Sequence, residues 1–434
     1  MSTYNSPISK LPIEMLLQIF HIYCDINSIQ QKLVESFDPP PDHVPDLVSL
    51  MRVSRAWRSV VVDFAPRLWS VIVVSEKSSD RGLQWARLCV DRSASVPLHI
   101  MIHLSPSPSD GNQKWFSSLM SILLRHHRRW KSIHMPSIVD RGCDCDEGTS
   151  VPPRFEMLET ATVYLSQSVQ LYPFPFFAKI SQSILNSPLL DNLESTVDLL
   201  APMHWPPAQI SNLRIPRAIH LPQLSLLANH FTHLRKLDVF LYHAETPRAL
   251  NPDQPAITFP KLESLHLAVW SDPGLLRFLK LPALRVLETP ACRFRSLAEM
   301  LSQSSCPITD IEFFRFFRRD INELTRFLRH DTALKSLKRL VIVSVASFHL
   351  HHCKTLLETI KDMVVARAPG LQDVRPVQSS LLTTMAALGW LEGQEEEELV
   401  TIMSFLEASG VSLDLSDSEC KFSVVFPDPI CEGA

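Results

Sequence analysis

The hydrophobic pattern near the N-terminus predicts a helix whose apolar surface covers most of its circumference. From residue 11 to residue 24, the strongly polar side chains after Pro12 are Glu14, Gln18 and His21, the last two falling 4 and 7 residues after the first. This spacing forms one narrow polar stripe on a helix. Pro12 suits the first turn, where its missing N–H costs nothing. Because a helix in a small unit normally buries one face, the rest of the chain or a partner must cover the remainder.

A second helical segment is predicted after Pro45. Asp46 stands at its start, where the helix dipole favours an acid, and apolar residues then recur at helical spacing through residue 64. These residues are Leu47, Leu50, Val53, Trp57, Val61 and Phe64. Pro66 ends the helix, and the β-branched run at residues 71–74 predicts a strand.

A Leu-x-x-Leu-x-Leu pattern recurs through the C-terminal part of the chain. Clear copies occupy residues 233–239, 261–267, 283–287, 307–313 and 336–342. Alignment of Leu234, Leu262, Leu284, Ile308 and Leu337 gives successive spacings of 28, 22, 24 and 29. Leucine-rich repeats have periods of about 20–29 residues, with the first Leu in the entry turn and the next two pointing inward from a short strand. Because no single unit can hide its apolar face, stacking would supply the core.

The segments between these copies complete the prediction of an α/β fold. Residues 275–279 and 296–301 have helical spacing and would back the strands. The Asn that usually follows the strand is missing from most copies, so the array is irregular. Weaker copies of the pattern lie at residues 130–133, 158–163 and 371–374. Loops are predicted at 105–111, 140–153 and 244–260. A helix from Glu395 to Leu406 and a strand at 421–426 would cap the array. The alternative is an unrelated α/β domain with coincidental Leu-x-x-Leu strands.

Short N-terminal motifs carry a resemblance to a known family. Leu11-Pro12-Ile13-Glu14 runs on to Ile19-Phe20, and Val53-Ser54-Arg55-Ala56-Trp57-Arg58 precedes Leu68-Trp69. This pattern resembles the F-box of fungal F-box proteins, and residues 83–88 and 92–100 extend the resemblance over residues 8–104. Ser54 stands where the family has Cys, and residues 28–45 form an insertion between the first and second helices. An ordinary buried helical hairpin is the alternative interpretation.

The resemblance implies the substrate-recognition subunit of an SCF-type (Skp-cullin-F-box) E3 ubiquitin ligase. The F-box would bind the Skp adaptor, and through it a cullin, while the repeats would bind a protein substrate and raise its effective concentration near the ubiquitin-loaded enzyme. The matched positions at or near the adaptor are Leu11, Pro12, Ile13, Leu16, Ile19 and Phe20, and those that pack the unit or extend the contact are Leu47, Leu50, Val53 and Trp57. We therefore predict an F-box at 1–75, a connecting helix and strand at 76–110 and a leucine-rich-repeat-like region with its C-terminal cap at 111–434.

Composition agrees with a folded, non-catalytic adaptor. The 434 residues are 45% hydrophobic with a formal net charge of −4, which gives no bias towards nucleic acid or anionic membranes. The sequence has no N-terminal signal peptide, and no apolar run is long enough to span a bilayer. Nine scattered cysteines favour free thiols in the cytosol or nucleus. No phosphate-binding glycine motif, H-E-x-x-H or catalytic triad is evident, so we expect no enzymatic activity and no cofactor.

Two further constellations have structural and functional interpretations. His349, His351, His352 and Cys353 are the densest set of metal-ligand residue types, but they lack a paired motif, and Cys143 and Cys145 are far away in sequence, so we expect no metal site. Residues 313–319 and 125–131 interleave aromatics with basic residues, which is typical of core aromatics alternating with solvated charges. The alternatives are a repeat face that holds an acidic peptide and single-stranded RNA binding. A ligase-independent interaction scaffold is the other alternative function.

Overall fold

The computed structural model describes residues 11–23, 46–75, 79–103, 110–138, 153–165, 180, 183–195, 209–241, 256–269, 273–290, 294–316, 320–330, 334, 336–344, 350–367, 395–409, 411–416 and 421–425. These residues form a mixed α/β structure dominated by parallel strands. The chain divides into two compact units, Met1–Ile210 and Ser211–Ala434. The predicted boundaries near residues 75 and 110 both fall inside the first unit, because the strands on either side of them pair with one another.

The first unit begins with short helices. They are α1 (Ile13–Tyr23), α3 (Asp46–Val53), α4 (Arg55–Ser59), the π-helix η2 (Val60–Phe64) and the 3-10 helix η3 (Pro66–Ser70). The predicted continuous helix over 46–64 is therefore wrong at Ser54. The Ser54 backbone is extended, and its hydroxyl oxygen accepts a hydrogen bond from the Trp57 backbone N–H at 3.1 Å. The serine hydroxyl thus satisfies a backbone N–H in the first turn of the new helix, which has no partner within that helix.

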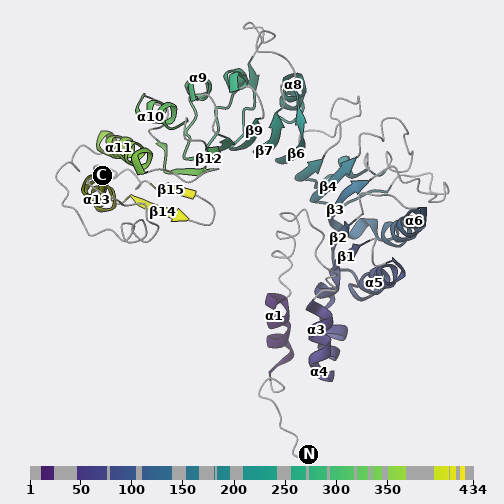
Figure 1. The fold of residues 1–434 in the computed structure, drawn as a ribbon. Helices are drawn as coiled ribbons and strands as arrows, with labels where there is room; N and C mark the ends of the chain where they lie inside the picture. Colours follow the sequence, from purple (N-terminus) through teal and green to yellow (C-terminus); the bar gives the residue numbers. More distant parts are fainter. Residues whose placement is uncertain are drawn as a thin grey trace, which may run out of the picture. The chain divides into compact units, whose positions relative to one another are not determined.

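A parallel sheet follows in the same unit. Its strands are β1 (Val71–Ser75), β2 (Leu98–His103), β3 (Trp130–Ile138), β4 (Thr160–Leu165) and β5 (Asn192–Ser195), in this order. Helices α5 (Ser79–Arg92) and α6 (Asp110–Leu124) connect the first three strands and lie on one face of the sheet (Figure 1). The predicted strand at 71–74 is confirmed by β1, and α5 and β2 lie within the segment 76–110 predicted to hold a connecting helix and strand. The predicted loop at 105–111 extends too far, because Asp110 and Gly111 already belong to α6, where an acid suits the helix start.

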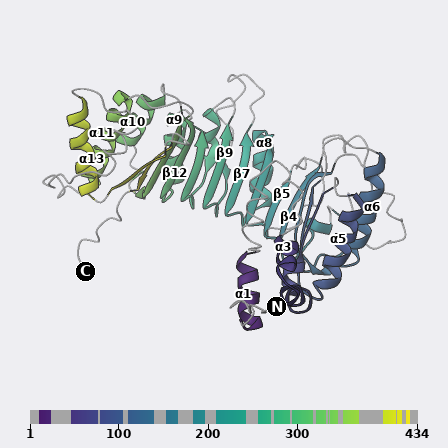
Figure 2. The ribbon, with the colours of Figure 1, turned by 60° about the horizontal axis from the view of Figure 1, so that its bottom comes forward.

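The second unit contains a larger sheet. Parallel strands β6 (Asn212–Ile219), β7 (Lys236–Leu241), β9 (Ser264–Val269), β11 (Val286–Pro290), β12 (Asp310–Phe316) and β13 (Arg339–Ser344) are followed by antiparallel β15 (Lys421–Val425) and β14 (Ser412–Ser416). Helices α8 (Leu221–His230), α9 (Phe294–Ser304), α10 (Ile321–His330) and α11 (Leu350–Arg367) lie on one face of it (Figure 2). Helix α13 (Glu395–Ala408) and the β14–β15 pair lie at the C-terminal end, as predicted for a cap.

Strand pairing places the aligned positions of the sequence pattern beside one another. Lys236, Ser264, Val286, Asp310 and Arg339 pair in succession across the sheet, and each lies two positions after an aligned Leu or Ile of the sequence pattern. Those aligned side chains are at most 2% exposed. Consecutive backbone N–H groups at each strand start donate to one carbonyl of the preceding copy, as Glu263 and Ser264 do to Arg235. The repeat is therefore a physical unit of backbone bonding as well as a sequence pattern.

Two connections differ from the predicted helices and loops. Residues 273–278 form the 3-10 helix η8 (Pro273–Phe278) in place of an α-helical turn, and β10 (Leu279–Lys280) follows it and pairs with β8 (Ile257–Thr258). The 3-10 helix is more extended per residue than an α-helix, which suits the shortest of the repeats, from Leu262 to Leu284. The second difference is β8 itself, which lies inside the predicted loop at 244–260.

Several predicted segments lie outside the described residues. They are the insertion at 28–45, the loop at 140–152, residues 244–255, the weak copy at 371–374, His349, and the pair Cys143 and Cys145.

Candidate protein-binding surface on the N-terminal helices

One aromatic contact attaches helix α1 to the helices that follow. Phe20 is fully buried, and its ring lies 4.8 Å from that of Trp57 with the planes inclined at 56°. Leu16, one turn earlier on α1, is also buried. Full burial of each such side chain contributes roughly 1.5–3 kcal/mol, so these two residues determine which side of α1 faces inward.

A second aromatic residue ties the helices η2 and η3 to α5. Trp69 is 1% exposed and donates from its indole Nε1 to the Val61 carbonyl oxygen at 2.9 Å. Its ring lies 5.7 Å from that of Trp85 on α5. The Arg92 guanidinium adds a hydrogen bond from α5 to the Val62 carbonyl oxygen at 3.4 Å. The Leu-Trp of the predicted motif is thus a core element that joins η2 and η3 to α5.

The ten residues predicted to contact the adaptor separate into a core set and an outer set. Leu16, Phe20, Leu47 and Leu50 are buried in the described structure, and Leu11 and Trp57 are half-buried. Pro12, Ile13, Ile19 and Val53 are exposed. The buried four pack the unit, so they can support a partner contact only indirectly, whereas the exposed four are available for direct contact.

Helix α1 carries an outward apolar stripe, of which the sequence analysis named only Ile19 as a site residue. Met15, Ile19 and Ile22 follow one another at intervals of 4 and 3 residues and are 47%, 39% and 78% exposed. This spacing places them together on one face of the helix, turned away from the face that carries Leu16 and Phe20. Tyr23, which is 53% exposed, extends the stripe. The sequence signal for this surface was the narrowness of the polar stripe. It leaves the helix with more apolar surface than a single buried face uses. We call Met15, Ile19 and Ile22 the outer stripe of α1.

The polar side of α1 adds little positive charge. Burial, together with the positive charge of Arg67, lowers the pKa of His21 below its ordinary value. The imidazole is therefore neutral at physiological pH. Glu14 and Gln18 are exposed. A partner for the outer stripe would consequently meet an apolar face flanked by one carboxylate and neutral polar groups.

The predicted basic and aromatic segments have structural roles where they are described. Phe313 is fully buried, so its ring is unavailable for stacking on a base. Arg129 donates to the Val96 carbonyl oxygen at 2.9 and 3.1 Å and to the Ser93 hydroxyl at 2.6 Å. Lys131 forms an ion pair with Glu159 at 3.5 Å. The plain interpretation of these segments therefore holds for these three residues.

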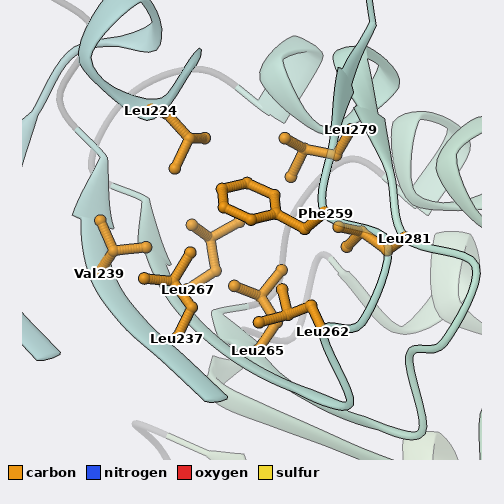
Figure 3. Close-up of a pocket in the computed structure, with 9 residues that line it drawn as sticks. All are labelled: Leu224, Leu237, Val239, Phe259, Leu262, Leu265, Leu267, Leu279 and Leu281. Carbon is orange, nitrogen blue, oxygen red and sulfur yellow. The ribbon is translucent and has the colours of Figure 1, made fainter. Parts of the chain in front are cut away.

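Metal and small-molecule sites have no strong candidate in the described part of the chain. Among the described residues, no group of three or more His, Cys, Asp or Glu side chains is arranged to hold a metal ion. A narrow cavity between α8 and the sheet of the second unit is lined by the nine residues labelled in Figure 3, from Leu224 to Leu281. All nine are hydrocarbon side chains, so the cavity offers no group that could orient a polar ligand and belongs to the core.

Comparisons with known proteins identify no relative. The chain matches no protein-family model, and no curated protein matches it significantly. None of the described helices is both long and apolar enough to cross a membrane.

Proposed function

We propose that the chain is the substrate-recognition subunit of an SCF-type ubiquitin ligase, with the N-terminal helices as its F-box. The outer stripe of α1 would dock on the Skp adaptor, and the sheet of the second unit would hold the substrate. The outer stripe is the observation that carries this proposal, because three large apolar side chains in line on one exposed helix face are typical of a helix that binds a partner.

The motif residues support the same function. Leu11 and Pro12 directly precede α1, Ile13 begins it, and the Trp57 ring contacts that of Phe20. A function that needs a catalytic or metal site has no comparable support among the described residues. The residues matched to the F-box motif therefore have two different tasks, with the inward face holding the helices together and the outward face meeting the adaptor.

Substitutions on the outer stripe test the proposal. The double variant Ile19→Glu, Ile22→Glu places two charges on the exposed face and leaves Leu16 and Phe20 untouched. The matched control is Leu88→Glu on α5, another exposed leucine of the same unit, 38% exposed. The full chain and each variant would be purified with the Skp adaptor, and the dissociation constant measured by titration calorimetry. Circular dichroism and the thermal midpoint report whether each variant stays folded.

We expect a 1:1 complex with the unsubstituted chain and the Leu88 variant. Two buried charges in an apolar interface should weaken the complex by more than about 100-fold without changing the thermal midpoint of the free chain. Equal affinity of the unsubstituted chain and the double variant would refute the docking role of the outer stripe. Failure of every chain to bind the adaptor would refute the ligase function and leave a free-standing interaction scaffold.

A further inference from the structure

The sheet of the second unit has one face that no described helix covers. Helices α8, α9, α10 and α11 lie against the opposite face (Figure 1 and Figure 2). In β7, for example, Leu237 and Val239 point into the core at 1% and 0% exposure, while Asp238 between them is half-buried on the other face. In β6, β7, β9, β11 and β12, alternation places the polar residue at this position on an open face, whereas both faces are buried at β13, where Val341 and its two neighbours are 0% exposed.

Strand register arranges charged residues of this open face in one row. Successive pairing brings together Arg214, Asp238, His266, Glu288 and Glu312 from β6, β7, β9, β11 and β12. Strands in a sheet are about 4.8 Å apart, so each member of the row lies beside the next. Along this row a basic group, a carboxylate and an imidazole are followed by two carboxylates.

The first three members of the row are joined by ion pairs. Asp238 accepts from the Arg214 Nε and from the His266 Nδ1, each at 3.0 Å. The hydrogen bond to Asp238 raises the pKa of His266 above its ordinary value, which keeps the imidazole protonated to higher pH. Asp238 therefore has two positively charged neighbours and no carboxylate charge to spare for a partner.

The last two members are left as neighbouring negative charges. Glu288 and Glu312 are directly paired on β11 and β12, and both are half-buried. Glu288 also lies beside His266 on β9, and its charge helps to raise the pKa of that imidazole. His266 is shared with Asp238, so it does not offset both glutamates. Like charges directly opposite one another on adjacent strands destabilise a sheet. Partial burial increases that cost, because water screens the repulsion less. A cation placed between the two carboxylates would relieve it.

An aromatic ring adjoins this pair. Phe314, two residues after Glu312 on β12, is half-buried on the same face, and its ring meets that of His266 edge-on at 5.3 Å. Phe314 is paired with Pro290, which lies two residues after Glu288. A carboxylate pair beside an aromatic ring suits a guanidinium, which binds carboxylates through its planar fork and stacks on aromatic faces.

We propose that this open face binds an arginine-bearing extended segment of a partner protein, with the guanidinium between Glu288 and Glu312 and beside Phe314. The identification of the bound segment as a ligase substrate rests on the proposed function, whereas the binding of an arginine-bearing segment does not depend on it. The alternative of an acidic segment is disfavoured at this place, because its carboxylates would face Glu288 and Glu312 while Arg214 is already engaged with Asp238.

The probe is a fluorescein-labelled hexapeptide in which arginine alternates with phenylalanine, titrated with the full chain and followed by fluorescence anisotropy. A peptide with citrulline in place of each arginine keeps the shape and hydrogen-bonding groups but removes the charge. The test variant is Glu288→Gln, Glu312→Gln. The matched control is Glu299→Gln, Glu323→Gln, which removes the same charge from α9 and α10 on the helical side.

We expect binding of the arginine peptide to the full chain, at least about tenfold weaker binding to the test variant and near-equal binding to the control. Phe314→Ala should also weaken binding. Equal binding by the test variant and the control, or equal binding of the citrulline peptide, would overturn the proposal, and so would absence of binding by the unsubstituted chain. Adaptor binding by the unsubstituted chain separates the two proposals. If that chain binds the peptide but not the adaptor, the ligase function fails and the arginine-binding surface remains.

Discussion

Two partly buried histidines on neighbouring strands of the first unit predict that this unit loses stability in mild acid. His134 on β3 lies near His103 on β2, with 6.4 Å between the ring centroids. Burial, with a smaller contribution from the charge of His103, lowers the pKa of His134 from 6.5 to about 4. The folded unit therefore holds His134 neutral at a pH where the unfolded chain binds a proton. The stability that this provides is complete above pH 6.5 and is lost progressively as the pH falls towards about 4.

The size of the effect follows from the two pKa values. At about 1.4 kcal/mol for each tenfold change in the protonation equilibrium, the full loss is about 3 kcal/mol, of which about 2 kcal/mol is reached at about pH 5. Burial also lowers the pKa values of His99 and His103, so the unsubstituted chain loses more than His134 alone accounts for. The variant His134→Gln isolates the contribution of this residue, including its coupling to His103.

Urea unfolding followed by tryptophan fluorescence measures this effect, because six of the eight tryptophans lie within residues 1–210. The free energy of unfolding would be measured at about pH 7.5 and about pH 5 for the unsubstituted chain, the His134 variant and the control His230→Gln, an exposed histidine of the second unit. We expect the pH-dependent loss to be smaller by about 2 kcal/mol in the His134 variant and unchanged in the control. Equal pH dependence in all three chains would refute the reasoning.

Three further predictions concern stability. Phe20→Ala should destabilise the helices by about 3–5 kcal/mol, because it removes a fully buried ring that packs against Trp57. Faster amide hydrogen exchange in α1 would report this loss, and unchanged protection would contradict the packing of α1. Ser54→Ala should cost about 1 kcal/mol in urea unfolding, while Ser54→Asp should restore most of it, and equal stability of both variants would argue against the cap. Glu288→Gln, Glu312→Gln should raise the free energy of unfolding by about 0.2–1 kcal/mol at low salt and by less at high salt. A loss of stability in that variant would show that the carboxylates have partners of their own.

The repeat was predictable because its signal is local and recurs. Leu234 and Leu262 each precede a strand by two residues, and the alternation that follows requires only a few neighbouring positions to be recognised. The aligned positions therefore marked where these strands begin, while the irregular spacings left open how the strands line up, and the structure pairs β7, β9, β11, β12 and β13 in succession. The break at Ser54 was missed because the apolar spacing from Leu47 to Phe64 continues across it, and a capping hydroxyl leaves that spacing unchanged.

The inner and outer faces of α1 show what local sequence could not decide. Ile19 and Phe20 are both large and apolar, and the helical pattern alone does not tell which of them faces the unit. The decision comes from Trp57, far along the chain, whose ring fixes Phe20 at 0% exposure and so turns Ile19 outward at 39%. A sequence pattern with two apolar faces therefore predicts that an outer surface exists, while tertiary packing determines its members.

The acidic pair on the second sheet needed both kinds of information. Glu288 and Glu312 are one repeat apart in the sequence, and each is an ordinary polar member of an alternating strand. They become neighbours only through the parallel register of β11 and β12, which the alignment of Leu284 with Ile308 implies. That alignment does not reveal that Arg214 and His266 both engage Asp238, so that His266, the cation beside Glu288, is shared with a third carboxylate. Even with His266 protonated, the row holds two cations against three carboxylates. This excess of one negative charge, at the Glu288–Glu312 end, is what gives the face its preference for a cationic partner.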